Sequence, residues 1–166
     1  MFLQHVERFA STSKLDFGTC LEWLTQHGEQ LTHAFVAEAP ATLLHGDLRL
    51  DNVVFGANEC AFLDWQLVRC GPAAYDVAYF LSSALHEDVT DVTPILQRYH
   101  EALGQPSYPY DALERDYQRA TLMILASLST ADEVDVGDGR GAEIMQRWYQ
   151  RLAARVAAIE PTQLGI

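Results

Sequence analysis

A single short strand–turn–strand pattern, set between long stretches of helical periodicity, limits the folds open to this chain. The apolar runs Val53–Phe55 and Ala61–Leu63 flank the turn-forming residues of "GANE" and predict a small β-hairpin. Apolar residues elsewhere recur at helical spacing, which predicts helices over residues 19–38, 73–84, 92–103, 110–131 and 140–160. The expected fold is therefore mainly α, in an α+β arrangement: a helical bundle with one hairpin.

The length of 166 residues fits one domain or one large lobe. Residues 1–18 show no periodic pattern and are expected to form an arm in front of a domain of residues 19–166. In the last predicted helix, an apolar stripe with a step of three or four residues predicts packing against the core. The stripe consists of Ile144, Trp148, Leu152, Val156 and Ile159.

Composition excludes several classes of function. The net charge of −12 argues against nucleic acid and anionic membranes as partners, and it is compatible with a cationic substrate or a bound metal. No apolar run approaches the roughly 20 residues that span a bilayer, and no signal peptide is recognisable. Cys20, Cys60 and Cys70 lack C-x-x-C spacing and read as reduced thiols, so we expect a cytoplasmic protein.

Polar side chains stand at both ends of the predicted hairpin. Asn52 precedes its first strand and Asp64 follows its second, so the hairpin brings these two positions side by side. Asp47, on the preceding loop, can reach the same place. Amide and carboxylate oxygens suit Mg²⁺, and a neighbouring carboxylate can accept a proton from a hydroxyl group. An unpaired charge at the end of an apolar strand is costly, so Asp64 is expected to need a partner such as a metal.

The spacing of His45, Asp47 and Asn52 matches the catalytic-loop pattern H-x-D-x-x-x-x-N, and Asp64 matches a downstream metal-binding aspartate. Phosphoryl transfer uses such groups to orient the nucleophile and to neutralise the phosphates. A simple turn is the alternative for Asp47 and Asn52 taken alone, because both residue types favour turns. The three residues together favour phosphoryl transfer.

Two ordered motifs, "HGDLRLDNVVF" and "FLDWQLVRCGPAAYDVAYFL", resemble a known family over about residues 42–85. The family is the aminoglycoside phosphotransferase and choline kinase-like group of small-molecule phosphotransferases, which includes ecdysteroid-kinase-like proteins and shares the protein-kinase fold. The resemblance implies a protein-kinase-like C-terminal lobe that helps transfer the γ-phosphate of ATP to a small-molecule hydroxyl group. It also implies Mg²⁺ as cofactor and ATP as co-substrate.

The resemblance further implies roles for matched residues. Asp47 would be the catalytic base on a catalytic loop of residues 45–52. Asn52 and Asp64 would hold Mg²⁺, with Asp64 at the start of a metal-binding segment, 64–66, after the hairpin of residues 53–64.

Supporting residues are implied in the same way. His45 would pack under the metal-binding segment, and Asp76 would accept hydrogen bonds from the backbone of the catalytic loop. Arg49 falls where related kinases place a contact to phosphate or substrate. Trp65 and Gln66 replace the Phe-Gly that follows the metal-binding aspartate in protein kinases, so no glycine hinge is expected there.

A glycine-rich loop and a strand lysine, which a kinase uses to hold ATP phosphates, are not recognisable. Only 44 residues precede His45, and the single lysine, Lys14, lies in no strand pattern. We therefore expect a C-terminal lobe only, whose N-terminal nucleotide lobe is absent or supplied by a separate chain. Two functions stay open: part of a small-molecule kinase, or a catalytically inactive, kinase-derived binding or scaffold module. The acidic segments "HEDVTD" and "ADEVDVGD" could attract a cationic substrate or form a solvated surface.

Overall fold

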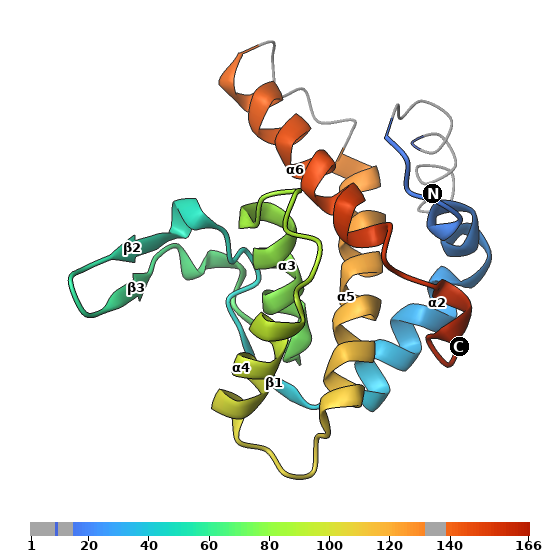
Figure 1. The fold of residues 1–166 in the computed structure, drawn as a ribbon, viewed down its shortest axis with the longest axis horizontal. Helices are drawn as coiled ribbons and strands as arrows, with labels where there is room; N and C mark the ends of the chain where they lie inside the picture. The colour runs from blue at the N-terminus through green and yellow to red at the C-terminus, as the bar shows by residue number, and fades with distance from the viewer. Residues whose placement is uncertain (1–8, 10–14, 132–138) are drawn as a thin grey trace.

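The structure is a computed structural model that describes residues 9, 15–131 and 139–166 (Figure 1). Most of the second acidic segment, residues 132–138, lies outside the described residues. The described elements are α2 (Cys20–Glu38), β1 (Ala41–Leu44), η1 (Leu50–Asn52), β2 (Val53–Phe55), β3 (Cys60–Phe62), η2 (Trp65–Leu67), β4 (Arg69–Pro72), α3 (Ala74–Ala84), α4 (Thr93–Leu103), α5 (Tyr110–Ala131), α6 (Arg140–Val156) and η3 (Pro161–Gln163). None of the described helices is long and apolar enough to cross a membrane.

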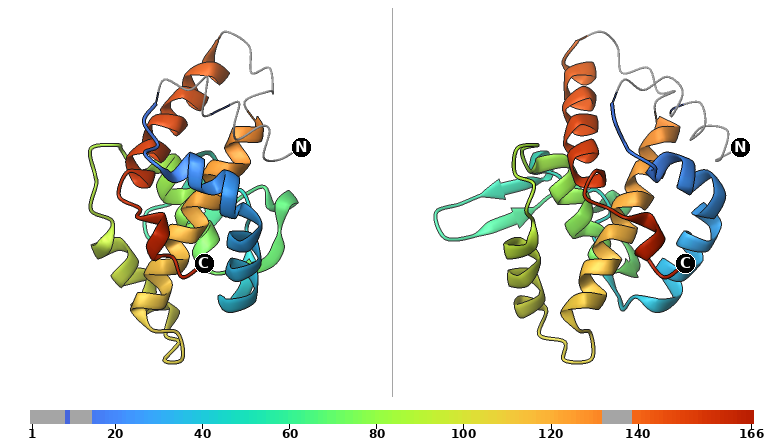
Figure 2. Two further views of the ribbon diagram at one scale, coloured as in Figure 1. Left: turned by 90° about the vertical axis from the view of Figure 1, so that its right-hand side faces the viewer. Right: turned by 45° about the vertical axis from the view of Figure 1, so that its right-hand side comes forward.

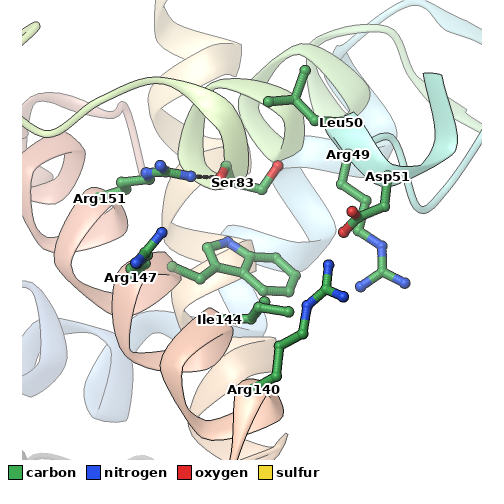
Figure 3. A pocket seen from close by; sticks show the side chains of 9 residues that line it. Arg49, Leu50, Asp51, Ser83, Arg140, Ile144, Arg147 and Arg151 are labelled. Atoms are coloured by element: carbon green, nitrogen blue, oxygen red, sulfur yellow. Dashed lines mark hydrogen bonds between the residues drawn. The ribbon is translucent and has the colours of Figure 1, made fainter. Parts of the chain in front are cut away.

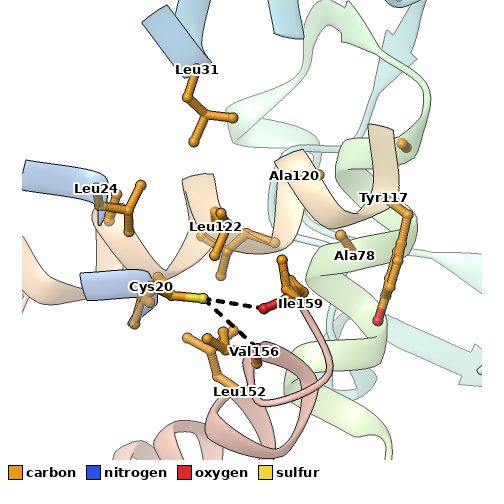
Figure 4. Packing of buried hydrophobic residues seen from close by; sticks show 14 of the residues in the cluster. Cys20, Leu24, Leu31, Ala78, Tyr117, Ala120, Leu122, Leu152, Val156 and Ile159 are labelled. Carbon is orange, nitrogen blue, oxygen red and sulfur yellow. Dashed lines mark hydrogen bonds between the residues drawn. The ribbon is translucent and has the colours of Figure 1, made fainter. Parts of the chain in front are cut away.

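Helix α5 is the central element of the helical part. Helices α3 and α2 lie on opposite sides of it, and α6 crosses its C-terminal end (Figures 1 and 2). Leu113 of α5 is fully buried, and Ala120 and Leu125 are buried together with the residues on either side of each, because neighbouring helices cover most of the helix surface there. Figure 4 shows how α2, α5 and α6 contribute side chains to one apolar cluster. The mainly α fold predicted from periodicity is confirmed.

The predicted helix boundaries differ from the observed ones mainly in α6. This helix ends at Val156, so Ile159 of the predicted stripe lies beyond it, although its side chain is still buried. Trp148, Leu152 and Val156 are buried as expected. Ile144 is 40% exposed, and the prediction of a core role for it is wrong. The reason is that the N-terminal half of α6 extends beyond the ends of the other helices (Figures 1 and 2).

The predicted hairpin is present, with Val53 opposite Phe62 in the antiparallel pair β2–β3. A second two-stranded pair was not predicted: β1 and β4 are antiparallel, with Leu44 opposite Arg69. The fold therefore has more than the one expected hairpin. The β1–β4 pair closes the segment of residues 45–68, because its two ends lie side by side. The loop, the hairpin and the turn after it therefore leave the helices and return to them at one place.

The hairpin projects from the helices, and no described helix covers either of its faces (Figure 1). Val54 is 51% exposed and Phe55 68% exposed, although both are large apolar residues. Phe62, Leu63 and, on β1, Leu43 are also exposed. We refer to these five side chains as the hairpin surface. Val54 and Phe55 are successive strand residues and point to opposite faces, so the hairpin exposes apolar side chains on both faces. Exposed apolar residues gathered on one element mark an interaction site more often than isolated ones do.

The segment before α2 was expected to be an arm, but two of its aromatic residues are buried in the core of the domain. Phe9 and Phe17 belong to the core, with ring centroids 5.5 Å apart. The Phe9 ring also lies 5.3 Å from the ring of Tyr149 on α6. At these positions the segment is part of the domain, because aromatic rings bury a large apolar area.

A buried charged group joins α5 to the C-terminal segment. Arg119 is 1% exposed and donates hydrogen bonds to the carbonyl of Leu164 through Nε (3.1 Å) and Nη2 (2.8 Å). Its Nη1 lies 2.8 Å from Glu38 at the end of α2 and 3.5 Å from Asp116. Asp116 also accepts a hydrogen bond of 2.7 Å from the Tyr108 hydroxyl. Burial raises the pKa of Asp116, and the Tyr108 hydrogen bond and the Arg119 charge oppose this shift.

Replacing Arg119 with Leu should destabilise the domain by about 3–5 kcal/mol, because it leaves the Asp116 carboxylate buried without its cation. The free energy of unfolding in urea measures this effect. Arg98→Leu, at an exposed position of α4, is the matched control and should change that free energy by less than about 0.5 kcal/mol. Equal effects of the two substitutions would show that the buried arginine contributes nothing specific.

Candidate active site

The catalytic-loop segment is held in place by a carboxylate from helix α3. Oδ2 of Asp76 accepts a hydrogen bond of 2.6 Å from the backbone N–H of His45, and Oδ1 accepts one of 3.0 Å from Gly46. These are the hydrogen bonds that the family resemblance implies for Asp76. Hydrogen bonds to a charged acceptor are stronger than neutral ones, so this contact fixes the start of the loop against α3.

Gly46 is required where the loop bends. Its φ is +85°, and a Cβ atom placed there would lie 2.4 Å from the carbonyl oxygen of Leu67. Both the left-handed backbone and the close approach of η2 exclude a larger residue. The "HG" of the sequence motif therefore reflects the way the segment after the hairpin packs on the loop.

His45 joins the catalytic loop to the end of the hairpin. Its Nδ1 accepts a hydrogen bond of 3.3 Å from the backbone N–H of Asp47, so Nε2 carries the proton and donates it to the carbonyl of Leu63 at 2.7 Å. The imidazole ring also lies 4.7 Å from the Trp65 ring. His45 thus contacts the backbone on both sides of the predicted site, which agrees with the supporting position expected for it.

The Asp47 carboxylate is oriented by three neighbours. Oδ1 accepts a hydrogen bond of 2.8 Å from the Tyr79 hydroxyl, and Oδ2 accepts one of 3.1 Å from Nδ2 of Asn52. Nε of Arg49 lies 3.5 Å from Oδ2. Asp47 is only 8% exposed, so these contacts leave it a single orientation. A carboxylate held in one orientation is the group that a general base requires.

Tyr79 is a site residue that the sequence analysis missed. Its pKa is raised, chiefly by burial and then by the hydrogen bond to Asp47, so it stays a neutral donor toward the carboxylate. A signal was present in the sequence, because Tyr79 follows Asp76 by three residues. Residues with this spacing lie on the same face of a helix. One face of α3 therefore presents both the anchor of the loop and a partner of the predicted base.

Asn52 and Asp64 stand at the open end of the hairpin, as predicted. The carbonyl of Asn52 accepts a hydrogen bond of 2.8 Å from the backbone N–H of Leu63, which places Asp64 next to this pair. The Asn52 amide nitrogen donates to both the carbonyl and Oδ2 of Asp47. The amide oxygen is therefore the atom that Asn52 can offer to a cation.

Asp64 is exposed, and the argument that its charge is costly at the end of an apolar strand is wrong. The strand itself is exposed, so water reaches the carboxylate, whose described hydrogen bond is from Gln66 at 3.4 Å. The backbone conformation of Asp64 is a stronger indication of a functional role. Among the described residues, Asp64 is the one non-glycine residue with positive φ, at φ 61° and ψ 61°. Such strained conformations concentrate at functional sites.

The donors around the loop fit a weakly held, hard cation. No cluster of three or more His, Cys, Asp or Glu side chains able to hold a metal occurs among the described residues. Asn52 and Asp64 offer one amide oxygen and one carboxylate. Mg²⁺ is commonly held by one or two protein oxygens and completes its shell with water and substrate phosphates. Two protein oxygens are therefore enough for Mg²⁺, and a site that supplied every ligand from the protein would suit it less well.

Two curated proteins match parts of this chain. Over 41 residues, the chain is 51% identical to human acyl-CoA dehydrogenase family member 11, covering 23% of the chain and 5% of that protein. Over 98 residues it is 34% identical to mouse acyl-CoA dehydrogenase family member 10, covering 57% of the chain and 8% of that protein. The chain thus matches less than a tenth of the length of these relatives. No solved structure matches it significantly.

The sequence model of the phosphotransferase enzyme family, APH, matches residues 4–120, which is more than half of the chain. This stretch contains the anchored catalytic loop, the hairpin and helix α3. The chain therefore belongs to the phosphotransferase enzyme family.

Proposed function

We propose that the chain is the C-terminal, catalytic lobe of a small-molecule kinase that transfers the γ-phosphate of ATP to a hydroxyl group. The observation that carries the proposal is the fixed Asp47 carboxylate, held between Tyr79 and Asn52 on a loop anchored by Asp76. Membership of a phosphotransferase family supports this chemistry.

In this proposal Asp47 accepts the proton of the attacking hydroxyl group. Each carboxylate oxygen has two lone pairs, so the oxygens that bind Tyr79 and Asn52 can still accept a hydrogen bond from a substrate. The two donors, together with Arg49, hold the carboxylate in one orientation. Orienting the acceptor in this way is a large part of catalysis of phosphoryl transfer, since the protein does little covalent chemistry.

Asn52 and Asp64 would hold Mg²⁺ through the amide oxygen and the carboxylate. The ion, when bound, would neutralise charge on the transferred phosphate. The left-handed backbone of Asp64 turns the chain away from β3 directly at this position. The short helix η2 follows and packs on Gly46, so the metal-binding segment and the catalytic loop support each other.

The hairpin surface is the proposed docking site for a nucleotide-binding lobe, carried by the same polypeptide or by another. Val54, Phe55, Phe62, Leu63 and Leu43 are apolar and exposed beside the two proposed metal ligands. A lobe that binds ATP must lie at this place to present its phosphates to Asn52 and Asp64. No glycine-rich loop or strand lysine is recognisable in the 166 residues, which supports supply of these parts by another segment.

The same observation supports a second function, a catalytically inactive binding or scaffold module that keeps the family's loop. The two functions differ in one measurable respect. The kinase requires phosphoryl transfer that depends on Asp47, whereas the scaffold requires only that the loop keep its shape.

Phosphoryl transfer from γ-labelled ATP to small hydroxyl compounds tests the proposal. We expect no turnover by the 166-residue chain alone, and turnover when it is joined to a nucleotide-binding lobe of the same family. In the joined protein, Asp47→Asn should reduce kcat about 10²- to 10⁴-fold, as expected for loss of a general base. The exposed Asp88→Asn is the control of equal charge. Equal rates for Asp47→Asn and the parent protein would favour the scaffold function.

Metal binding can be measured without turnover. We expect Mn²⁺ to bind in the roughly millimolar range, because phosphates are needed to complete the shell. Paramagnetic broadening of NMR signals should centre on residues 50–66 and disappear in Asp64→Asn. Broadening that persists in Asp64→Asn, or that spares these residues, would contradict the assignment of the metal ligands.

Stability distinguishes the anchor from the proposed base. Asp76→Ala leaves the N–H groups of His45 and Gly46 without their acceptor and should cost about 1–3 kcal/mol of unfolding free energy. Asp47→Asn keeps an oxygen for the Tyr79 hydroxyl and should change stability by less than about 1 kcal/mol. Urea unfolding of the two variants decides the matter. A silent Asp76→Ala with a strongly destabilising Asp47→Asn would reverse the two roles.

A further inference from the structure

A small pocket lined by arginines lies between the catalytic loop, α3 and the N-terminal half of α6 (Figure 3). Its volume is about 200 Å³, which is below the range of about 300–1,000 Å³ typical of sites for drug-sized ligands. Arg49 and Asp51 come from the catalytic-loop side, and Arg140, Arg147 and Arg151 from α6. The pocket can therefore hold a small polar group of a larger molecule.

The charge of this pocket is opposite to that of the chain. Four arginines and one aspartate line it, an excess of three positive charges, whereas the chain carries a net charge of −12. The four arginines are drawn from a total of only eleven Lys and Arg residues. Three of them lie on α6 with spacings of seven and four residues, which puts them on one helix face. A local positive field in an acidic protein selects anions.

The arginines of the pocket differ in the hydrogen bonds and ion pairs that their side chains make. Arg151 donates to the carbonyl of Ser83 and lies 3.9 Å from Glu87, so it is fixed at one wall. The side chains of Arg140 and Arg147 make no hydrogen bond or ion pair with other described residues. Figure 3 shows the Arg140 side chain extending toward Arg49 and Asp51. Asp51 offsets part of the repulsion between the Arg49 and Arg140 guanidinium groups, and a bound anion would offset more of it.

Buried donors without acceptors lie around the same pocket. Within the described part of the chain, Nε1 of Trp148 is buried and makes no hydrogen bond. Nε of Arg49 and of Arg151 also make none, although they lie 3.5 Å from Asp47 and 3.9 Å from Glu87. Trp148 itself is 9% exposed. Buried polar atoms are satisfied in most proteins, and an unsatisfied donor costs about 1–3 kcal/mol. An oxyanion has several acceptor lone pairs and could satisfy donors of this kind.

The pocket adjoins the proposed base through two contacts. Nε of Arg49, a pocket residue, lies 3.5 Å from the Asp47 carboxylate. The ring of Trp148 meets the edge of Tyr79 at 5.1 Å between centroids, and the Tyr79 hydroxyl donates to Asp47. Asn52 and Asp64 do not line this pocket. It therefore borders Asp47 without including the proposed ligands of Mg²⁺.

From these observations we infer that the phosphate acceptor is an anionic hydroxyl compound, whose carboxylate or phosphate group binds between Arg49 and Arg140 in a pocket that Arg147 also lines. The inference rests on the proposed kinase function for the step at Asp47, and it adds the chemical class of the substrate. Arg49 then joins the two parts of the site, because its guanidinium contacts both the base and the bound anion. Arg140 and Arg147 determine specificity.

Anion binding by the 166-residue chain tests the inference independently of turnover. Inorganic phosphate and acetate are titrated separately and followed by the indole Nε1–H signal of Trp148 and by the arginine Nε–H signals in NMR spectra. At least one of the two anions should shift these signals, and the affinity should fall with rising salt. Which anion binds more tightly distinguishes a phosphate-bearing acceptor from a carboxylate. Choline, a cationic hydroxyl compound, should leave the signals unchanged.

The double variant Arg140→Gln/Arg147→Gln should bind the anion at least about threefold more weakly. Arg98→Gln, exposed on α4, is the control of equal chemistry and should bind like the parent chain. Equal weakening in both variants, no shift with either anion, or binding of choline would overturn the inference. Displacement of the bound anion by a Mg²⁺–ATP analogue, in the chain joined to a nucleotide lobe, would also overturn it, since the pocket would then hold nucleotide phosphates.

Asp47→Asn separates this inference from the proposed function. The variant should bind the anion at least as tightly as the parent chain, because Asp47 does not line the pocket and the charge removed lies 3.5 Å from Arg49. Anion binding with no Asp47-dependent phosphoryl transfer would leave the pocket intact and contradict the kinase function. Asp47-dependent transfer to neutral or cationic acceptors, without anion binding, would contradict only the substrate class.

Discussion

The two hydrogen bonds from the backbone of His45 and Gly46 to the Asp76 carboxylate are the contact on which the site depends. They join the buried start of the loop to a helix whose other face is in the core. Once the loop begins at a fixed point, Asp47 meets Tyr79, and Asn52 closes the loop by donating back to Asp47. Removing the anchor would therefore displace every other contact of the loop.

Helix α3 both packs in the core and supports the catalytic loop. Ala74, Ala78 and Leu81 are buried against the neighbouring helices, while Asp76 and Tyr79 face the loop. The side that packs on α5 is therefore apolar and small, and the opposite side is polar. A rigid element that carries the supporting residues holds a site more accurately than a loop can by itself.

The distribution of charge suggests how a chain with a net charge of −12 could use an anionic substrate. Acidic residues dominate the composition, yet the arginines of α6 collect beside the catalytic loop. Over distances longer than about 10 Å, salt screens the net charge, so the local arginines decide what binds in the pocket. The acidic segment of residues 86–91, which could attract a cationic substrate or form a solvated surface, does not line this pocket.

The sequence by itself determined the helical character, the hairpin and the identity of the loop residues, because these depend on local periodicity and on residue spacing. It also indicated Asp47, Asn52 and Asp64 as a group, since a hairpin brings its two ends together by local geometry alone. Contacts between distant segments followed only from the tertiary structure. The β1–β4 pair, the hydrogen bond from Tyr79 to Asp47, and the arginines of α6 beside Arg49 join parts of the chain far apart in sequence. Periodicity identifies the buried face of a helix, but which neighbour covers it, and where Ile144 is left exposed, depends on how the whole bundle packs.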